Sequence, residues 1–131
     1  MTRLFVCIVA LFVLVSCGGG AITNDSAYRS LVGYAKTDSD FLTYSAGRTI
    51  GGVTGIVNLD ENRVQIMFTI VNPPCDRCEP TSAGRATAVR TTEGAWLMDC
   101  MEYPDNYGNI FMGHQACGVN RTMEELATHA D

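Results

Sequence analysis

The chain has 131 residues, of which 47% are hydrophobic and 18% charged, with a formal net charge of −5 at pH 7. A chain of this size forms one small domain rather than two. The acidic balance excludes nucleic acid as the expected partner, because phosphate binding needs clustered Lys and Arg, and Lys36 is the only lysine. It also argues against electrostatic attachment to anionic lipids.

Residues 4–15 form an unbroken apolar run that follows a single positive charge, Arg3. A run of this length suits an export signal but falls short of the roughly 20 residues that a membrane-spanning helix needs. A buried helix of a soluble domain would need a polar face, and this run has none. We therefore expect residues 1–16 to be a signal peptide that is removed from the mature protein.

The apolar run ends in Leu14-Val15-Ser16-Cys17, and three glycines follow it. This stretch resembles the lipobox of bacterial lipoproteins. The resemblance implies that the Cys17 thiol carries a diacylglyceryl group and that Cys17 becomes the first mature residue, with its amine open to acylation. Two or three acyl chains anchor a protein stably, since each buried methylene contributes about 0.8 kcal/mol.

The lipobox resemblance also implies a location and a domain organisation. The protein is expected in the cell envelope, attached to the membrane through the lipid on Cys17. Gly18, in place of the aspartate linked to inner-membrane retention, favours the outer membrane in a two-membrane bacterium. Residues 17–25 are expected to be a flexible tether and residues 26–131 a single small β-rich domain. Ordinary secretion without a lipid is the alternative.

Six cysteines are present, of which Cys7 lies in the expected signal peptide and Cys17 in the lipobox. In an exported small domain, the four that remain indicate two disulfides. They allow three connectivities. We favour the pairing of nearest neighbours in the sequence, Cys75–Cys78 with Cys100–Cys117.

The first expected element of the domain is a short helix over residues 27–32. Asn24 or Asp25 is expected to cap it. Its buried face is expected to hold Tyr28, Leu31, Val32 and Ala35.

Several strands are expected to follow this helix. Residues 63–70 alternate between apolar and polar side chains, as a half-buried strand does, and residues 52–59 are expected to pair with them through a turn at residues 60–62. The glycines in the first of these strands indicate a bulge or a bend. Further strands are expected at residues 41–46, 85–92, 95–103 and 109–116, with a tight turn at Glu93-Gly94.

About six antiparallel strands predict a mostly β domain, either a small barrel or a sandwich. Thr122 and Glu125 match a capping box, so a short C-terminal helix is expected to run to about His129. Tyr44-Ser45-Ala46-Gly47 and the hairpin over residues 52–70 are similar to the small β-barrel surface lipoproteins of the transferrin-binding-protein type. This resemblance covers two strands and implies no binding residues.

The sequence Cys75-Asp76-Arg77-Cys78 admits a thiol-redox interpretation, but Pro80 and Gly84 interrupt the helix that such a centre needs. Zinc could be held by Cys75, Cys78, His114 and Cys117. Copper(I) could be held by Met98, Met101, Met112 and His114, although strand alternation predicts opposite faces for Met98 and Met101.

The sequence therefore predicts a lipid-anchored envelope protein that acts as a binding or structural module. Its protein or small-molecule ligand is not identified. No catalytic residue, no metal ligand and no cofactor other than the lipid on Cys17 is assigned, and no hydrolytic motif is present. The alternative function is a thiol-redox or metal-handling envelope protein that uses Cys75 and Cys78.

Overall fold

The computed structural model describes residues 20–45, 47–107, 109 and 113–131. The signal peptide and Cys17 expected from the sequence lie outside these residues. In chain order the elements are α2 (Asn24–Thr37), α3 (Ser39–Tyr44), β1 (Thr49–Asp60), β2 (Arg63–Val71), β3 (Thr81–Arg90), β4 (Trp96–Tyr103), β5 (His114–Thr122) and α4 (Met123–Ala127). Among the described residues, no helix combines the length and the apolar character that crossing a bilayer requires.

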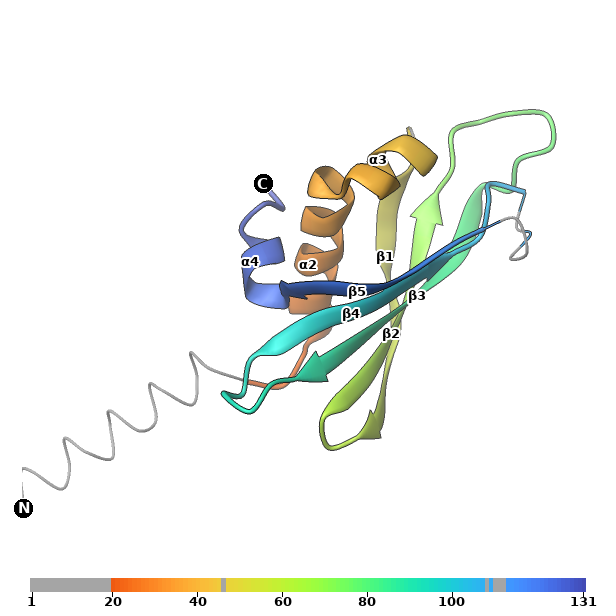
Figure 1. Ribbon diagram of the computed structural model, residues 1–131. Coiled ribbons are helices and arrows are strands. Elements are labelled where there is room, and N and C mark those ends of the chain that lie inside the picture. The colour runs from red at the N-terminus through yellow and green to blue at the C-terminus, as the bar shows by residue number, and fades with distance from the viewer. Residues whose placement is uncertain (1–19, 46, 108, 110–112) are drawn as a thin grey trace, which may run out of the picture.

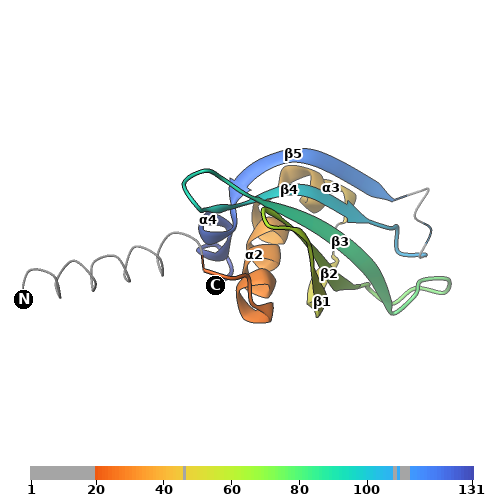
Figure 2. The ribbon, with the colours of Figure 1, turned by 90° about the horizontal axis from the view of Figure 1, so that it is seen from below.

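The five strands form one antiparallel sheet in the order β1-β2-β3-β4-β5, so each strand pairs with its neighbour in the sequence. Two views show a twisted sheet with α2 and α4 packed against one of its faces (Figures 1 and 2). The predicted mostly β, antiparallel class with a short C-terminal helix is therefore confirmed. β1 and β5 form the two edges of the sheet, which is not closed.

The hydrophobic core lies between the sheet and α2. Val64, Ile66, Phe68 and Ile70 of β2 are all buried, which confirms the predicted alternation. α2 contributes Ala27, Leu31 and Tyr34 from the opposite side. Trp96, at the start of β4, is also buried in this core.

The face and the cap of the first helix differ from the prediction. The helix runs from Asn24 to Thr37, and its N-cap is Thr23, which forms a capping box with Ser26. Tyr28, predicted to be buried, is 38% exposed, because the helix turns Gly33 and Tyr34 towards the core instead. Gly33 can lie there because it has no side chain to keep it away from α4.

The predicted strand at residues 41–46 is wrong, because residues 39–44 form helix α3. The side chain of Asp38 caps this helix by accepting a hydrogen bond from the backbone N–H of Phe41 at 2.8 Å. Phe41 is the one buried residue of the helix and packs edge-on against Tyr34 and Tyr103. Ala46 lies outside the described residues. The described residues accordingly contain five strands and not six.

A β-bulge in β4 corrects the predicted arrangement of Met98 and Met101. Adjacent residues of β3, Thr87 and Ala88, pair with Cys100 and Met98, so Asp99 is the extra residue of β4. Because of the extra residue, the side chain of Met101 points to the same face of the sheet as that of Met98. Both methionines are fully buried in the core. They therefore lie on the same face of the sheet and not on opposite faces.

The last strand begins later than predicted, at His114 instead of residue 109. Gly118 and Asn120 both have positive φ angles, which interrupt the regular alternation that sequence analysis relies on. Residues 110–112 lie outside the described residues. The predicted turn at Glu93-Gly94 is confirmed, with φ of 90° at Gly94 and a hydrogen bond from the Thr91 N–H to the Ala95 carbonyl.

Two further predictions concern β1 and α4. The register between β1 and β2 shifts at Gly52 and again at Gly55, which confirms the bulges expected from these glycines. Thr122 caps α4 as predicted, accepting from the backbone N–H of Glu125 at 3.0 Å. The Glu125 carboxylate does not reach back to the cap; it accepts from the Arg121 guanidinium instead.

Candidate functional site

The domain has two ends along the sheet, which we name by the segments found there. The N-terminal end holds residues 20–23 and the turns at residues 61–62 and 91–95. The loop end holds residues 47–48, the β2–β3 loop at residues 72–80 and the start of the β4–β5 connection at residues 104–107 (Figure 1). The candidate site lies at the loop end.

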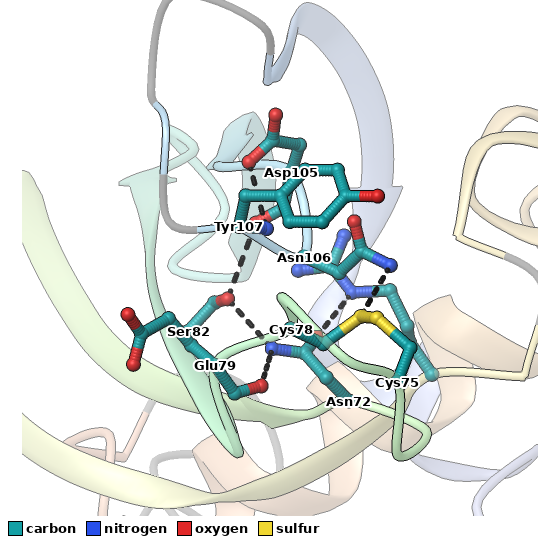
Figure 3. The surroundings of a disulfide bond; sticks show 9 residues. Asn72, Cys75, Cys78, Glu79, Ser82, Asp105, Asn106 and Tyr107 are labelled. Atoms are coloured by element: carbon teal, nitrogen blue, oxygen red, sulfur yellow. Dashed lines mark hydrogen bonds between the residues drawn. A yellow bond between two sulfur atoms is a disulfide. The ribbon is translucent and has the colours of Figure 1, made fainter.

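The β2–β3 loop is closed by a disulfide between Cys75 and Cys78, and the other disulfide joins Cys100 to Cys117. This is the pairing that the sequence analysis favours. No helix follows Cys75; instead the Cys78 N–H donates to the Cys75 carbonyl at 3.2 Å in a tight turn. The Asn106 amide donates to the Cys78 sulfur at 3.3 Å and links this loop to the β4–β5 connection (Figure 3).

Asn72, the buried residue that opens the loop, joins three segments of the chain. Its side-chain amide donates to the Glu79 carbonyl at 2.8 Å and to the Ser82 hydroxyl at 2.9 Å (Figure 3). Ser82 in turn donates to the Asp105 carbonyl at 3.2 Å. Both N–H groups of the Asn72 amide are thus engaged within the protein, which holds the loop end in one arrangement.

Arg48 completes this network and is only 8% exposed. Its Nε donates to the Asn72 Oδ1 at 2.7 Å and its Nη1 to the Ser45 hydroxyl at 3.2 Å. Its Nη2 is buried and has no hydrogen-bond partner among the described residues. Burial lowers the pKa of Arg48, while Tyr103 and Asp105 act in the opposite direction.

A cluster of aromatic rings lies beside the Arg48 side chain. The guanidinium carbon lies 6.0 Å from the centroid of the Tyr103 ring. The rings of Tyr44 and His114 lie 6.0 Å and 5.2 Å from the same ring, between centroids. The His114 Nε2 is likewise buried without a hydrogen-bond partner within the described part of the chain.

A small cavity opens beside Arg48. Its volume is about 160 Å³, and its lining residues are Tyr44, Arg48, Pro73, Asp105 and Asn106. The walls therefore combine an aromatic ring and a proline with one cation and one carboxylate. The buried Arg48 forms part of the wall of this cavity. The cavity opens beside the loop that the Cys75–Cys78 disulfide closes.

The structure does not bring the proposed zinc ligands together. Cys75 and Cys78 lie in the β2–β3 loop and are bonded to each other. Cys117 pairs with Cys100 on the face of the sheet that points away from the core, whereas His114 packs on the inner face against Tyr103. No group of three or more His, Cys, Asp or Glu side chains is placed to hold a metal in the described ranges.

The proposed copper ligands are also not assembled into an accessible site. Met98 and Met101 are fully buried in the hydrophobic core, where they fill space beside apolar neighbours. Met112 lies outside the described residues, as does the lipidation residue Cys17. The candidate site thus differs from every set of residues expected from the sequence except for the Cys75–Cys78 loop that borders it.

Arg48 and Asn72 are the residues of this site that the sequence analysis missed. Neither carries a local pattern that separates it from an ordinary exposed loop residue. Their contact joins positions 24 residues apart, on either side of the β1–β2 hairpin. Only the pairing of β1 with β2, in which Thr49 lies opposite Val71, brings the two together.

Comparison of the chain with models of protein families, with curated proteins and with solved structures finds no match.

Proposed function

We propose that this chain is a lipid-anchored protein of a bacterial cell envelope whose folded domain is a binding or structural module. The lipobox resemblance at Leu14–Cys17 is the starting point. The two disulfides support the same compartment, because disulfides persist in oxidising environments outside the cytoplasm.

The observation that carries the proposal is how soon after Cys17 the folded domain begins. The Trp96 indole N–H donates to the Gly20 carbonyl at 3.2 Å, and Ile22 packs against the core. Thr23 caps α2, so residues 20–25 belong to the domain rather than to a tether. The link from Cys17 to Gly20 then spans at most about 11 Å.

So short a link gives the domain an orientation. A lipid on Cys17 holds the N-terminal end next to the headgroups. The loop end, with Arg48 and the Cys75–Cys78 loop, lies at the opposite end of the sheet (Figure 1). The candidate site accordingly faces away from the membrane, where a soluble or a protein ligand reaches it.

The intact mass of the membrane-extracted protein tests this proposal, after free thiols have been alkylated without reduction. The expected mass starts at Cys17, carries acyl chains and contains no alkylated cysteine. Cys17→Ser should abolish the acyl mass, and Cys7→Ser, in the expected signal peptide, is the matched control that should leave it unchanged. An unlipidated mass for the unaltered chain would contradict the proposal.

Thiol chemistry at Cys75 and Cys78 is the second candidate, and one observation favours it. The disulfide lies at an exposed loop, with Cys75 accessible to solvent. No helix begins there to stabilise a thiolate among the described residues. Alkylation of Cys75 and Cys78 in the non-reduced protein, or reductase activity that Cys75→Ser removes from a folded protein, would favour this candidate over a structural disulfide.

A further inference from the structure

The cavity at the loop end is lined by a buried cation, Arg48. Arg48 is only 8% exposed, yet among the described residues it forms no ion pair. Its two hydrogen-bond partners, Asn72 and Ser45, are neutral. Asp105 lines the same cavity but forms no ion pair with Arg48. A buried charge without an ion-pair partner destabilises the folded state, so such a residue indicates a bound ligand or a functional role.

We infer that this cavity binds a carboxylate group, with the Arg48 guanidinium as its principal donor. The inference rests on the proposed function, since it names the class of ligand that the binding module takes. The same chemistry is offered by a small organic acid and by the C-terminal carboxylate of a peptide. In both cases a carboxylate oxygen gives the unpartnered Nη2 of Arg48 an acceptor.

The size of the cavity and the charge around it favour a carboxylate over a phosphate. A volume of about 160 Å³ accommodates a group of only a few heavy atoms. One arginine balances one negative charge, whereas a phosphate dianion would place a second charge beside Asp105. The flat carboxylate also matches the planar fork of guanidinium donors.

The walls of the cavity indicate what the carboxylate is attached to. Tyr44 and Pro73 present apolar surface beside the charged group. A short apolar substituent, such as an alkyl chain or the side chain of a small C-terminal residue, can pack against these walls. Asp105 opposes a negative ligand, so its charge limits the affinity of the site.

The test is a titration of the ¹⁵N-labelled full mature protein with sodium propionate, at constant ionic strength against sodium chloride. N-acetyl-alanyl-alanine is titrated in parallel as the peptide C-terminus. Chemical shifts of the Arg48 Nε–H and of the amides of Tyr44, Asp105 and Asn106 are followed. We expect saturable binding in the millimolar range of dissociation constants.

Three variants separate the role of Arg48 from nonspecific attraction. Arg48→Met should weaken binding about tenfold or more, because it removes a charge-assisted donor. Arg77→Met, in the neighbouring loop, is the matched control: it makes the same charge change at an exposed position that does not line the cavity, and should leave affinity unchanged. Asp105→Asn keeps the Oδ1 acceptor used by the loop and should tighten binding severalfold.

Each result decides the inference. Shifts no larger than those with chloride, equal weakening by Arg77→Met, or no tightening by Asp105→Asn would each overturn it. If Arg48→Met does not fold, Arg48→Lys takes its place and should weaken binding, because Lys lacks the planar fork. Binding of the peptide alone identifies a protein C-terminus as the source, and binding of both probes identifies small acids as well.

Failure of the inference is distinct from failure of the proposed function. A lipidated protein that binds neither carboxylate overturns the inference and leaves the lipoprotein proposal standing. An unlipidated protein that binds propionate through Arg48 does the reverse.

Discussion

The backbone carbonyl oxygen of Leu126 in α4 occupies the space where a Cβ atom on Gly33 of α2 would lie. The two helices cross at this point because Gly33 has no side chain. Gly33→Ala should therefore force α4 away from α2 and lower the free energy of unfolding by about 3 kcal/mol or more. Chemical denaturation, followed by far-UV circular dichroism, measures the loss.

Gly52→Ala is the matched control for this substitution. Gly52 has no heavy atom within 4 Å of its would-be Cβ, and like Gly33 it lies within an element of secondary structure, strand β1. Its free energy of unfolding should change by less than about 1 kcal/mol. Equal destabilisation by the two substitutions would show that the crossing of α2 and α4 is not as close as described.

Gly84 of β3 lies directly opposite Phe68 of β2, and the Phe68 ring covers it. A Cβ on Gly84 would come within 2.5 Å of the tip of that ring. Gly84→Ala should lower stability by about 1–3 kcal/mol through overpacking. In the Phe68→Leu background the same substitution should cost much less, because the ring is gone. Additive losses in this double-mutant cycle would contradict the contact.

The two disulfides should differ in their contribution to stability. Cys100–Cys117 spans a sequence separation of 17, against 3 for Cys75–Cys78. Loop-closure entropy predicts that the longer loop stabilises by about 3 kcal/mol and the shorter by about 2 kcal/mol. Urea denaturation of the Cys100→Ser/Cys117→Ser and Cys75→Ser/Cys78→Ser double variants compares them. A larger loss for the shorter loop would run against this expectation.

Alkaline pH should destabilise the protein through its buried tyrosines. Burial raises the pKa of Tyr103 from 10.0 to about 12, and burial also raises the pKa of Tyr34. Between pH 10 and pH 12 the folded state keeps a proton on Tyr103 that the unfolded chain releases. The free energy of unfolding is therefore at its full value below pH 10 and falls as the pH rises towards 12. Tyr103→Phe should remove part of the loss.

Urea midpoints measured between pH 8 and pH 12 test this dependence. Tyr107→Phe is the matched control, because Tyr107 is 56% exposed on the β4–β5 connection. It should leave the slope of stability against pH unchanged. A Tyr103→Phe protein with the same slope as the unaltered chain would contradict a buried, protonated Tyr103.

Local sequence patterns were sufficient for the parts of the fold that rest on neighbouring residues. The alternation in β2, the Glu93-Gly94 turn and the Thr122 cap are each encoded within a few positions, and each is present in the structure. The cysteine pairing favoured from sequence proximity is also the one in the structure.

Tertiary contacts decided what local patterns could not. Residues 41–44 are compatible with a strand, but the Asp38 cap and the burial of Phe41 against Tyr103 make them helical. The bulge at Asp99 places both Met98 and Met101 on the inward face. Such a register shift depends on the partner strand, so the sequence of β4 alone does not reveal it.

The candidate site depends on tertiary contacts and not on local sequence patterns. Sequence alone indicated an exported, disulfide-containing, mostly β chain, since export signals, cysteine number and hydrophobic periodicity are properties of short segments. Burial of the Arg48 charge is a property of the assembled sheet, in which α3, the start of β1 and the β2–β3 loop close around it. A sequence specifies which residues are charged, but only the packing of distant segments determines which of those charged side chains become buried and desolvated.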